Sequence, residues 1–267
     1  MSLPPSLSTA PAGAAFLPAA ELRIVTYNVH SCIGTDRRLD PARIADVLAS
    51  LEPDVVALQE LDVGRRRTGG IDQAFAIAEA MKMASHFHPA LLVREEKYGD
   101  AILTSLPSRL VKAGPLPSVG EPRGALWLEV MVGEQPVHIF NTHFGLRRTE
   151  RIRQAEALTG PDWIGAAQQI GGPIVLAGDF NAIPSSPGYR RLAAALRPIT
   201  QQDGRLLAPT FPSRFPLLRL DHLFVSEGVT VVSAAPVRTP LTGLASDHLP
   251  LQAQLRLTTG TIPAPGR

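Results

Sequence analysis

The stretch 125–142, ALWLEVMVGEQPVHIFNT, decides the fold class of this chain of 267 residues. Two runs rich in Val, Ile and Leu, Ala125–Val132 and Val137–Thr142, are separated by a short turn that contains Gly133-Glu134-Gln135. So short a connection can join antiparallel strands only, because parallel neighbours need a crossover of a dozen or more residues. We therefore predict a hairpin here, which excludes a wholly parallel, doubly wound sheet.

Further apolar runs closed by turn residues predict more strands. These are Leu22–Val29, Asp54–Gln59, Ala101–Thr104, Pro173–Phe180, Leu220–Val225, Val229–Ser233 and Leu251–Leu257. Helical spacing of apolar residues predicts the helices Pro41–Leu51, Ile71–Met83, Thr149–Gln169 and Gly188–Leu196. The runs Leu220–Val225 and Val229–Ser233 suggest a second hairpin. Strands outnumber helices, so we expect antiparallel or mixed sheets with helices on their outer faces.

Composition indicates a globular chain with a sizeable core. Hydrophobic residues make up 45% and charged residues 19%, and the net charge is +2. These values exclude a disordered chain, and no run reaches the ~18 apolar residues of a membrane helix. The single cysteine, Cys32, excludes an internal disulfide and a cysteine zinc site. The chain has 23 arginines and 3 lysines, for which a GC-rich genome is the simplest cause and binding of a phosphate-bearing partner is the other interpretation. The net charge alone does not argue for nucleic acid.

The two ends differ from the middle of the chain. Residues 1–20 are rich in Pro, Ala and Ser and lack the positive start of a secretory signal, so we expect a disordered arm and a cytoplasmic protein. Residues 258–267 are expected to form a frayed tail. No internal repeat or long linker interrupts residues 21–257, which we interpret as one domain.

Polar residues end or interrupt the predicted strands at six places, where a purely structural strand would carry none. They are Asn28, Glu60, His143, Asp179 with Asn181, Asp221, and Asp247 with His248. If these ends converge, the site holds several carboxylates, histidines and amides but no thiol. Carboxylate and amide oxygens are hard ligands, which suit Mg²⁺ or Mn²⁺ rather than zinc. Together with acid–base side chains, they predict hydrolysis of a phosphate ester.

Each of these residues alone is weak support. An aspartate after a strand is usually a turn or a helix cap, and a single histidine is more often structural. Asn28 could simply cap a turn. The recurrence of such residues at six strand ends is what favours a catalytic site.

The motifs that carry these residues resemble the endonuclease/exonuclease/phosphatase superfamily, which includes deoxyribonuclease I, exonuclease III-type apurinic endonucleases, neutral sphingomyelinases and inositol-polyphosphate 5-phosphatases. They are TYNVH (26–30), LQE (58–60), GDAILTSLP (99–107), NTHFGL (141–146), AGDFNAIP (177–184), RLDHLF (219–224) and SDHLP (246–250). The resemblance covers residues 21–257. It implies an α/β (α+β) fold, a four-layer sandwich of two face-to-face mixed β-sheets flanked by helices.

The resemblance also implies roles around a metal ion. Glu60 resembles the principal metal ligand, with Asn28 beside the metal and the scissile phosphate. Asp247 resembles a second carboxylate near the metal. Asp179 resembles the residue that positions or activates the attacking water, and Asn181 resembles the asparagine that helps to hold phosphate and water.

The two histidines are similar to the pair that contacts the phosphate in the family. His143 resembles the histidine that contacts a phosphoryl oxygen or assists the leaving group. His248 resembles the second histidine, oriented by Asp221. An acid–histidine pair is physically reasonable, because the carboxylate fixes the tautomer of the imidazole and raises its basicity.

Two further segments resemble small bacterial stand-alone hydrolases of the superfamily more than DNA-repair nucleases. They are APTFPSRFPLLRLDHLFVS (208–226) and EPRGALW (121–127). Arg123 could contact substrate phosphate or form a surface ion pair. Asp100 stands where the related bacterial pattern has Asn, so it could contact the substrate region, orient His143 or repel an anionic substrate.

The sequence thus favours a divalent-metal-dependent phosphodiesterase that acts on a phospholipid-type or other small phosphodiester. A nuclease on DNA or RNA is the alternative, followed by a phosphomonoesterase or a non-catalytic binding module. Nothing in the sequence implies a stable protein partner. The arginines 65–67 are expected to be a solvated loop, with contact to an anionic substrate as the other interpretation.

Overall fold

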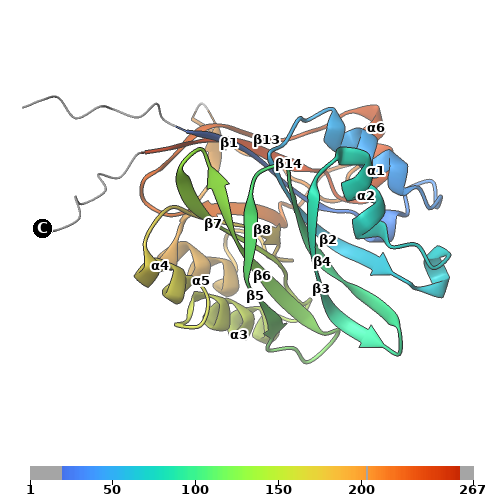
Figure 1. Cartoon of the computed structure of the whole chain (residues 1–267), viewed down its shortest axis with the longest axis horizontal. Coiled ribbons are helices and arrows are strands. Elements are labelled where there is room, and N and C mark those ends of the chain that lie inside the picture. Colours follow the sequence, from blue (N-terminus) through green and yellow to red (C-terminus); the bar gives the residue numbers. More distant parts are fainter. Residues whose placement is uncertain (1–19, 203, 259–267) are drawn as a thin grey trace, which may run out of the picture.

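Two six-stranded mixed sheets lie face to face in the computed structural model, which describes residues 20–202 and 204–258 (Figure 1). The first sheet has the order β13 (Val229–Pro236), β14 (Leu251–Leu257), β1 (Glu21–Asn28), β2 (Val55–Val63), β4 (Glu96–Thr104) and β3 (Ala84–Val93). The second has the order β5 (Ser108–Leu116), β6 (Arg123–Val132), β7 (Gln135–His143), β8 (Ile174–Asp179), β12 (Asp221–Val225) and β9 (Arg197–Pro198). A small ribbon pairs β10 (Gln201–Gln202) with β11 (Arg205–Leu206).

The helices lie on the outer faces of the two sheets (Figure 1). Beside the first sheet are α1 (Pro41–Ala49), α2 (Gln73–Met81) and α6 (Pro240–Ala245), and beside the second are α3 (Arg148–Thr159), α4 (Ile164–Ile170) and α5 (Pro187–Ala195). Two short 3-10 turns are η1 (His30–Cys32) and η2 (Arg66–Thr68). No helix in the described part of the chain is long and apolar enough to cross a membrane.

Three buried clusters hold the layers together. The central one fills the space between the sheets with aliphatic side chains such as Ile24, Leu126 and Leu255. The outer two lie between each sheet and its helices. Each fully buried aliphatic side chain contributes about 1.5–3 kcal/mol relative to exposure. The expected four-layer arrangement is confirmed. Most of the predicted arm 1–20 and tail 258–267 lies outside the described residues.

Several local predictions are also confirmed. Strands β6 and β7 form the hairpin predicted from residues 125–142, with Val132 opposite Gln135 and Gly133 at φ +62° in the turn. Helix α1 begins after Asp40, whose carboxylate accepts from the Arg43 backbone N–H at 3.0 Å. This bond satisfies one of the unpaired amides at the helix start.

The second predicted hairpin is wrong. Strand β12 pairs with β8 and β9 in the second sheet, whereas β13 pairs with β14 in the first. The chain crosses between sheets at residues 226–228, where Ser226 N donates to Ile174 O (3.0 Å) and its hydroxyl accepts from Ile174 N (2.9 Å). A short connection with apolar flanks fits a hairpin and a crossing equally well, and these bonds to β8 decide it.

Other differences between the predicted and observed elements arise at helix-breaking residues and at sheet edges. The predicted helix 149–169 is two helices, α3 and α4, because Gly160-Pro161 interrupts the pattern. Strands β3 and β5 were not predicted, and both are edge strands with mixed polarity. Pro89 in β3 lies at a register shift, a position that edge strands tolerate. Helix α6 is too short to be seen as a periodic pattern.

A pair of buried amides joins the two sheets directly below their polar end. Gln59 Nε2 of β2 donates to Asn141 Oδ1 of β7 at 2.8 Å, across the sandwich. Asn141 Nδ2 donates back to the carbonyls of Leu58 and Ala101 at 2.9 Å. Both side chains are fully buried. We call this pair the Gln59–Asn141 clamp.

Replacing Asn141 by alanine should destabilise the fold by about 2–4 kcal/mol, because buried acceptors and the Gln59 amide lose their partner. Urea unfolding measures the loss. Gln169→Ala, a truncation at an exposed helical position, should stay within about 0.5 kcal/mol of the parent. A comparable change in both variants would contradict a special role for the clamp.

Candidate active site

The polar strand ends meet at one end of the sandwich. Strands β7 and β8 are parallel, so His143 and Asp179, their last residues, lie side by side in register. Strand β12 runs antiparallel to β8 and begins at the same edge, which places Asp221 opposite Asp179. In the other sheet, β1 ends at Asn28 beside β2.

Asn28 connects the two sheets at this end. Its Nδ2 donates to Glu60 Oε1 at 2.8 Å and to Asp179 Oδ2 at 3.0 Å. Its Oδ1 accepts from the His30 backbone N–H at 3.0 Å, so the amide nitrogen is the end that faces the carboxylates. The Ser246 hydroxyl donates to the Asn28 backbone carbonyl at 2.7 Å and ties the last loop to β1. Sequence reasoning did not identify Ser246.

Glu60 is aimed at the site by a bulge in β2. Its φ is +62°, and the register between β2 and β4 shifts between Leu58 and Leu61. A bulge turns one side chain out of the regular alternation. A non-glycine residue in this region costs about 1 kcal/mol or more, so the surrounding contacts must hold it there. The Glu60 side chain is 22% exposed, in contrast to the buried carboxylates behind it.

His143, Asp179 and Asn181 form the centre of the site. His143 Nε2 is 3.5 Å from Asp179 Oδ2 and 3.9 Å from Glu60 Oε1. Asp179 Oδ1 accepts from the Asn181 backbone N–H at 2.8 Å, which fixes the turn after β8. Burial raises the pKa of Asp179, with Asp221 adding to the rise and His248 opposing it. Burial, with the positive charge of Arg123, lowers the pKa of His143 well below its usual value.

Asp221 and His248 form a buried acid–histidine pair, as predicted. His248 Nδ1 donates to Asp221 Oδ2 at 2.8 Å, and His248 Nε2 lies 3.7 Å from Asp179 Oδ2. Burial alone would lower the pKa of His248, but the Asp221 and Asp179 carboxylates outweigh it and raise the pKa to about 10. The imidazole is therefore a cation at neutral pH, with Nε2 directed at the centre of the site.

Arg123 lies behind His143 and is nearly buried. Its Nη1 is 3.1 Å from His143 Nδ1 and 2.7 Å from Glu121 Oε1. A guanidinium has only donors, so Nδ1 must accept and the imidazole proton must be on Nε2. Asn181 Nδ2 also lies 3.1 Å from Nε2 and donates one of its two hydrogens to the Phe144 carbonyl at 2.9 Å. The nearby acceptors for a proton on Nε2 are the carboxylates of Asp179 and Glu60, at 3.5 and 3.9 Å. Arg123 thus sets the tautomer of His143.

Asp100 and Asp247 lie beside the centre rather than in it. Asp100 is 3% exposed, its carboxylate accepts from the Glu60 backbone N–H, and burial raises its pKa to about 7. The contact at His143 Nδ1 comes from Arg123 and not from Asp100. Asp247 is half-buried, and the Ser246 hydroxyl lies 3.4 Å from its Oδ1.

The donor set fits a hard divalent cation. Among the described residues, two groups have ligand atoms within 4.8 Å of one another: Glu60 with His143 and Asp179, and Asp179 with Asp221 and His248. The carboxylates of Glu60 and Asp179 both accept from the Asn28 amide in this largely buried site. Their two negative charges favour the binding of a cation. Asp247 belongs to neither group.

Further neighbours were missed by sequence reasoning. The Phe211 ring lies 4.8 Å from the His248 ring and forms one wall of the site. Arg67 binds the buried Asp62 with Nε and Nη2 at 2.7 and 2.8 Å, and its guanidinium lies over Tyr98. The arginine loop is therefore anchored to β2 through this pair rather than freely solvated, although Arg66 is exposed. No periodic signal in the sequence marks these contacts.

Comparison with known proteins agrees with this geometry. Residues 25–248 match the model of the Endonuclease/Exonuclease/phosphatase family. The chain belongs to this family, whose members hydrolyse phosphoester bonds, and it is an ester-bond hydrolase. The family depends on divalent metal ions.

Three relatives illustrate the similarity. The chain is 29% identical over 251 residues to the uncharacterized protein YbhP of Escherichia coli (strain K12), covering 88% of this chain and 96% of YbhP. An endonuclease/exonuclease/phosphatase from Beutenbergia cavernae superposes with a TM-score of 0.73 at 21% identity, over 90% and 72% of the two chains. A mannosyl-6-phosphatase of Bacteroides thetaiotaomicron gives 0.69 at 19% identity, over 88% and 99%.

His222, which follows Asp221 in β12, has a structural role. It is fully buried, donates through Nε2 to the Ala182 carbonyl at 2.7 Å, and packs 4.7 Å from the Tyr189 ring. Burial lowers its pKa to about 4. Because the folded pKa lies below the unfolded value, the unfolded state binds more protons between about pH 4 and 6.5. Stability is therefore lost as the pH falls through that range.

Replacing His222 by glutamine should remove this part of the pH dependence. We expect the parent to lose about 2–3 kcal/mol more than His222→Gln does between pH 7 and pH 4.5. Urea unfolding at the two pH values gives the difference. Equal losses in the two proteins would show that His222 does not titrate in this way.

Proposed function

We propose that this protein is a phosphodiesterase that uses Mg²⁺ or Mn²⁺ to hydrolyse a phospholipid-type or other small phosphodiester by direct attack of water. The observation that carries the proposal is the surroundings of Asp179. Oxygen Oδ2 of this buried carboxylate lies within 3.7 Å of Asn28 Nδ2 and of both histidine Nε2 atoms. A carboxylate with a raised pKa in that position can orient a water molecule and accept its proton.

The two histidines then have different tasks. His143 is neutral with its proton on Nε2, as the Arg123 contact requires, and can donate it to a phosphoryl or leaving oxygen. His248 is held as a cation by Asp221 and can bind the phosphate anion. Asn181, fixed by the Phe144 carbonyl, lies beside His143 and is suited to holding phosphate and water.

Glu60 would be the principal metal ligand. Its side chain is the most exposed of the central carboxylates, and Asn28 links it to Asp179. When bound, the divalent cation supplies charge stabilisation to the phosphoryl oxygens. The amide nitrogen of Asn28 faces the carboxylates, so we propose that Asn28 aligns Glu60 and Asp179. A metal contact from Asp247 stays a prediction.

The other two residues predicted to contact the substrate, Arg123 and Asp100, are both buried. Arg123 is 7% exposed and paired with Glu121, so we propose that it acts through His143 rather than by direct binding of phosphate. Asp100 is buried behind Glu60 and is proposed to support the Glu60 backbone. The cytoplasmic location expected from the sequence stays a prediction.

The class of ester is the first question for an assay. With Mg²⁺ or Mn²⁺, we expect cleavage of bis-p-nitrophenyl phosphate to exceed that of p-nitrophenyl phosphate. Preferential monoester cleavage would support the phosphomonoesterase alternative, and cleavage of DNA or RNA in preference to small diesters would support the nuclease.

Glu60→Gln should lower diester turnover by about a hundredfold or more, because a neutral amide binds the cation poorly.

Glu60→Gln keeps the size of the side chain, so its melting temperature should stay close to the parent in metal-free buffer. Gln169→Ala is the control variant and should keep the turnover of the parent. Unchanged metal-dependent turnover in Glu60→Gln would reject the proposed metal site. Asp179→Ala should abolish diester cleavage.

His248→Gln should separate binding of the phosphate from binding of the metal. The cation at Nε2 is lost, so we expect kcat to fall by about a hundredfold, with a much smaller change in metal affinity. Steady-state kinetics and metal-binding calorimetry provide the two measurements. Parallel losses of turnover and of metal affinity would assign His248 a structural role instead.

A further inference from the structure

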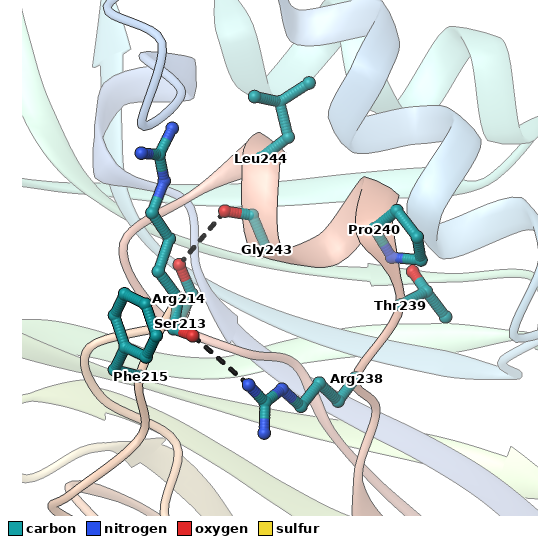
Figure 2. Close-up of a pocket in the computed structure, with 8 residues that line it drawn as sticks. All are labelled: Ser213, Arg214, Phe215, Arg238, Thr239, Pro240, Gly243 and Leu244. Atoms are coloured by element: carbon teal, nitrogen blue, oxygen red, sulfur yellow. Dashed lines mark hydrogen bonds between the residues drawn. The ribbon is translucent and has the colours of Figure 1, made fainter.

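The loop 213–218 presents large apolar side chains to solvent. Phe215 is 75% exposed and Leu217 is 76% exposed, and Leu241 at the start of α6 is 38% exposed. An open hollow of about 650 Å³ lies between this loop and α6 (Figure 2). Exposed apolar side chains gathered in this way usually mark an interaction surface.

The loop is held in place by hydrogen bonds and is not a loose end. Ser213 N donates to the Asp247 carbonyl at 2.7 Å, and its hydroxyl donates to the Ser246 carbonyl at 2.6 Å. The Phe211 carbonyl accepts from Leu217 N and Leu218 N at 2.8 Å. The exposure of Phe215 and Leu217 is thus fixed by the fold.

The same surface is basic. Arg214 and Arg238 are exposed and line the hollow, where Arg238 Nη2 donates to the Arg214 carbonyl at 3.2 Å (Figure 2). Among the described residues, neither arginine has a carboxylate within ion-pair distance. Arg214, Phe215 and Arg238 line the hollow, and the exposed Leu217 and Leu241 follow in the same loop and in α6. We call these five residues the basic apolar face.

A second basic turn adjoins this face. Thr35 N and its hydroxyl donate to the carbonyls of Leu244 and Gly243, and Thr35 Oγ1 accepts from Arg214 Nε at 3.1 Å. The turn carries exposed Arg37 and Arg38. Asp36 and Asp40 share the nearly buried Arg43 at 3.1 and 3.3 Å. With Arg37 and Arg38, three arginines therefore face two aspartates, and the region keeps a net positive charge.

The face also reaches the active site. Ser213 binds the residue that precedes His248, and Phe211 at the base of the loop contacts the His248 ring. The loop that carries the basic apolar face is therefore attached directly beside the active site.

We propose that the basic apolar face binds the surface of an anionic lipid bilayer, with Phe215 and Leu217 entering the interface and Arg214 and Arg238 binding lipid phosphates. This deepens the proposed function by identifying a membrane lipid as the substrate class. Guanidinium groups bind phosphate through two parallel donors, and aromatic and leucine side chains favour the boundary of the acyl chains.

Vesicle sedimentation tests the proposal without turnover when it is done in the Glu60→Gln background. The probes are vesicles of phosphatidylcholine alone and of phosphatidylcholine mixed with phosphatidylglycerol in equal parts. We expect binding to the mixed vesicles only, weakened by salt. Failure of the proposed hydrolysis would leave this binding result unaffected.

Two double variants separate the contributions. Phe215→Ser with Leu217→Ser should weaken binding by about tenfold or more, because the inserted apolar area is lost. Arg214→Gln with Arg238→Gln should weaken it about twentyfold at low salt. Leu206→Ser, at a 74% exposed position in the β10–β11 ribbon, is the matched control and should bind like the parent.

All variants should keep the melting temperature of the parent, because the altered side chains are exposed. Absence of binding to mixed vesicles, equal binding to neutral vesicles, or unchanged binding in the double variants would each overturn the proposal. Concentration-dependent self-association that is lost in the Phe215/Leu217 variant, without vesicle binding, would assign the face to a second copy of the chain and also overturn it.

Discussion

The Gln59–Asn141 clamp is the interaction on which the arrangement of the site depends. Two sheets held by aliphatic packing alone could slide, because hydrophobic contacts have little directional preference. The hydrogen bond between these buried amides has a direction and a length, and breaking it would leave polar groups unsatisfied. Gln59 directly precedes Glu60, and Asn141 lies two residues before His143. The clamp therefore fixes one functional residue from each sheet relative to the other.

Above the clamp, the site gathers charge in a place where water is scarce. Burying several carboxylates together is unfavourable unless cations and donors compensate. Asn28 donates to two of the carboxylates, and Asp221 holds His248 as a cation. Two histidines that look alike in the sequence thus acquire different charge states, neutral for His143 and cationic for His248. A guanidinium lies behind His143, whereas a carboxylate lies behind His248.

The layered fold is shared with solved structures of the family, whereas the rim of the site is formed by loops. A likeness to a mannosyl-6-phosphatase at 19% identity shows that the fold is shared, and leaves the ester to be decided elsewhere. In this chain the rim includes Phe211 and the exposed loop that follows it. Under the proposed function, the strand ends would carry out the chemistry at the phosphate, and the loops would select the molecule that carries it.

By itself, the sequence determined the mixed-sheet class and the β6–β7 hairpin, and it predicted the polar residues that the strand ends bring together, because apolar runs and polar strand ends are local patterns. The tertiary structure alone decided that β12 and β13 belong to different sheets, since a short apolar connection permits either pairing. It alone showed the edge strands β3 and β5, the bulge that turns Glu60 toward Asp179, and the guanidinium behind His143. These features depend on contacts between segments far apart in the chain, and no local periodicity or spacing encodes such contacts.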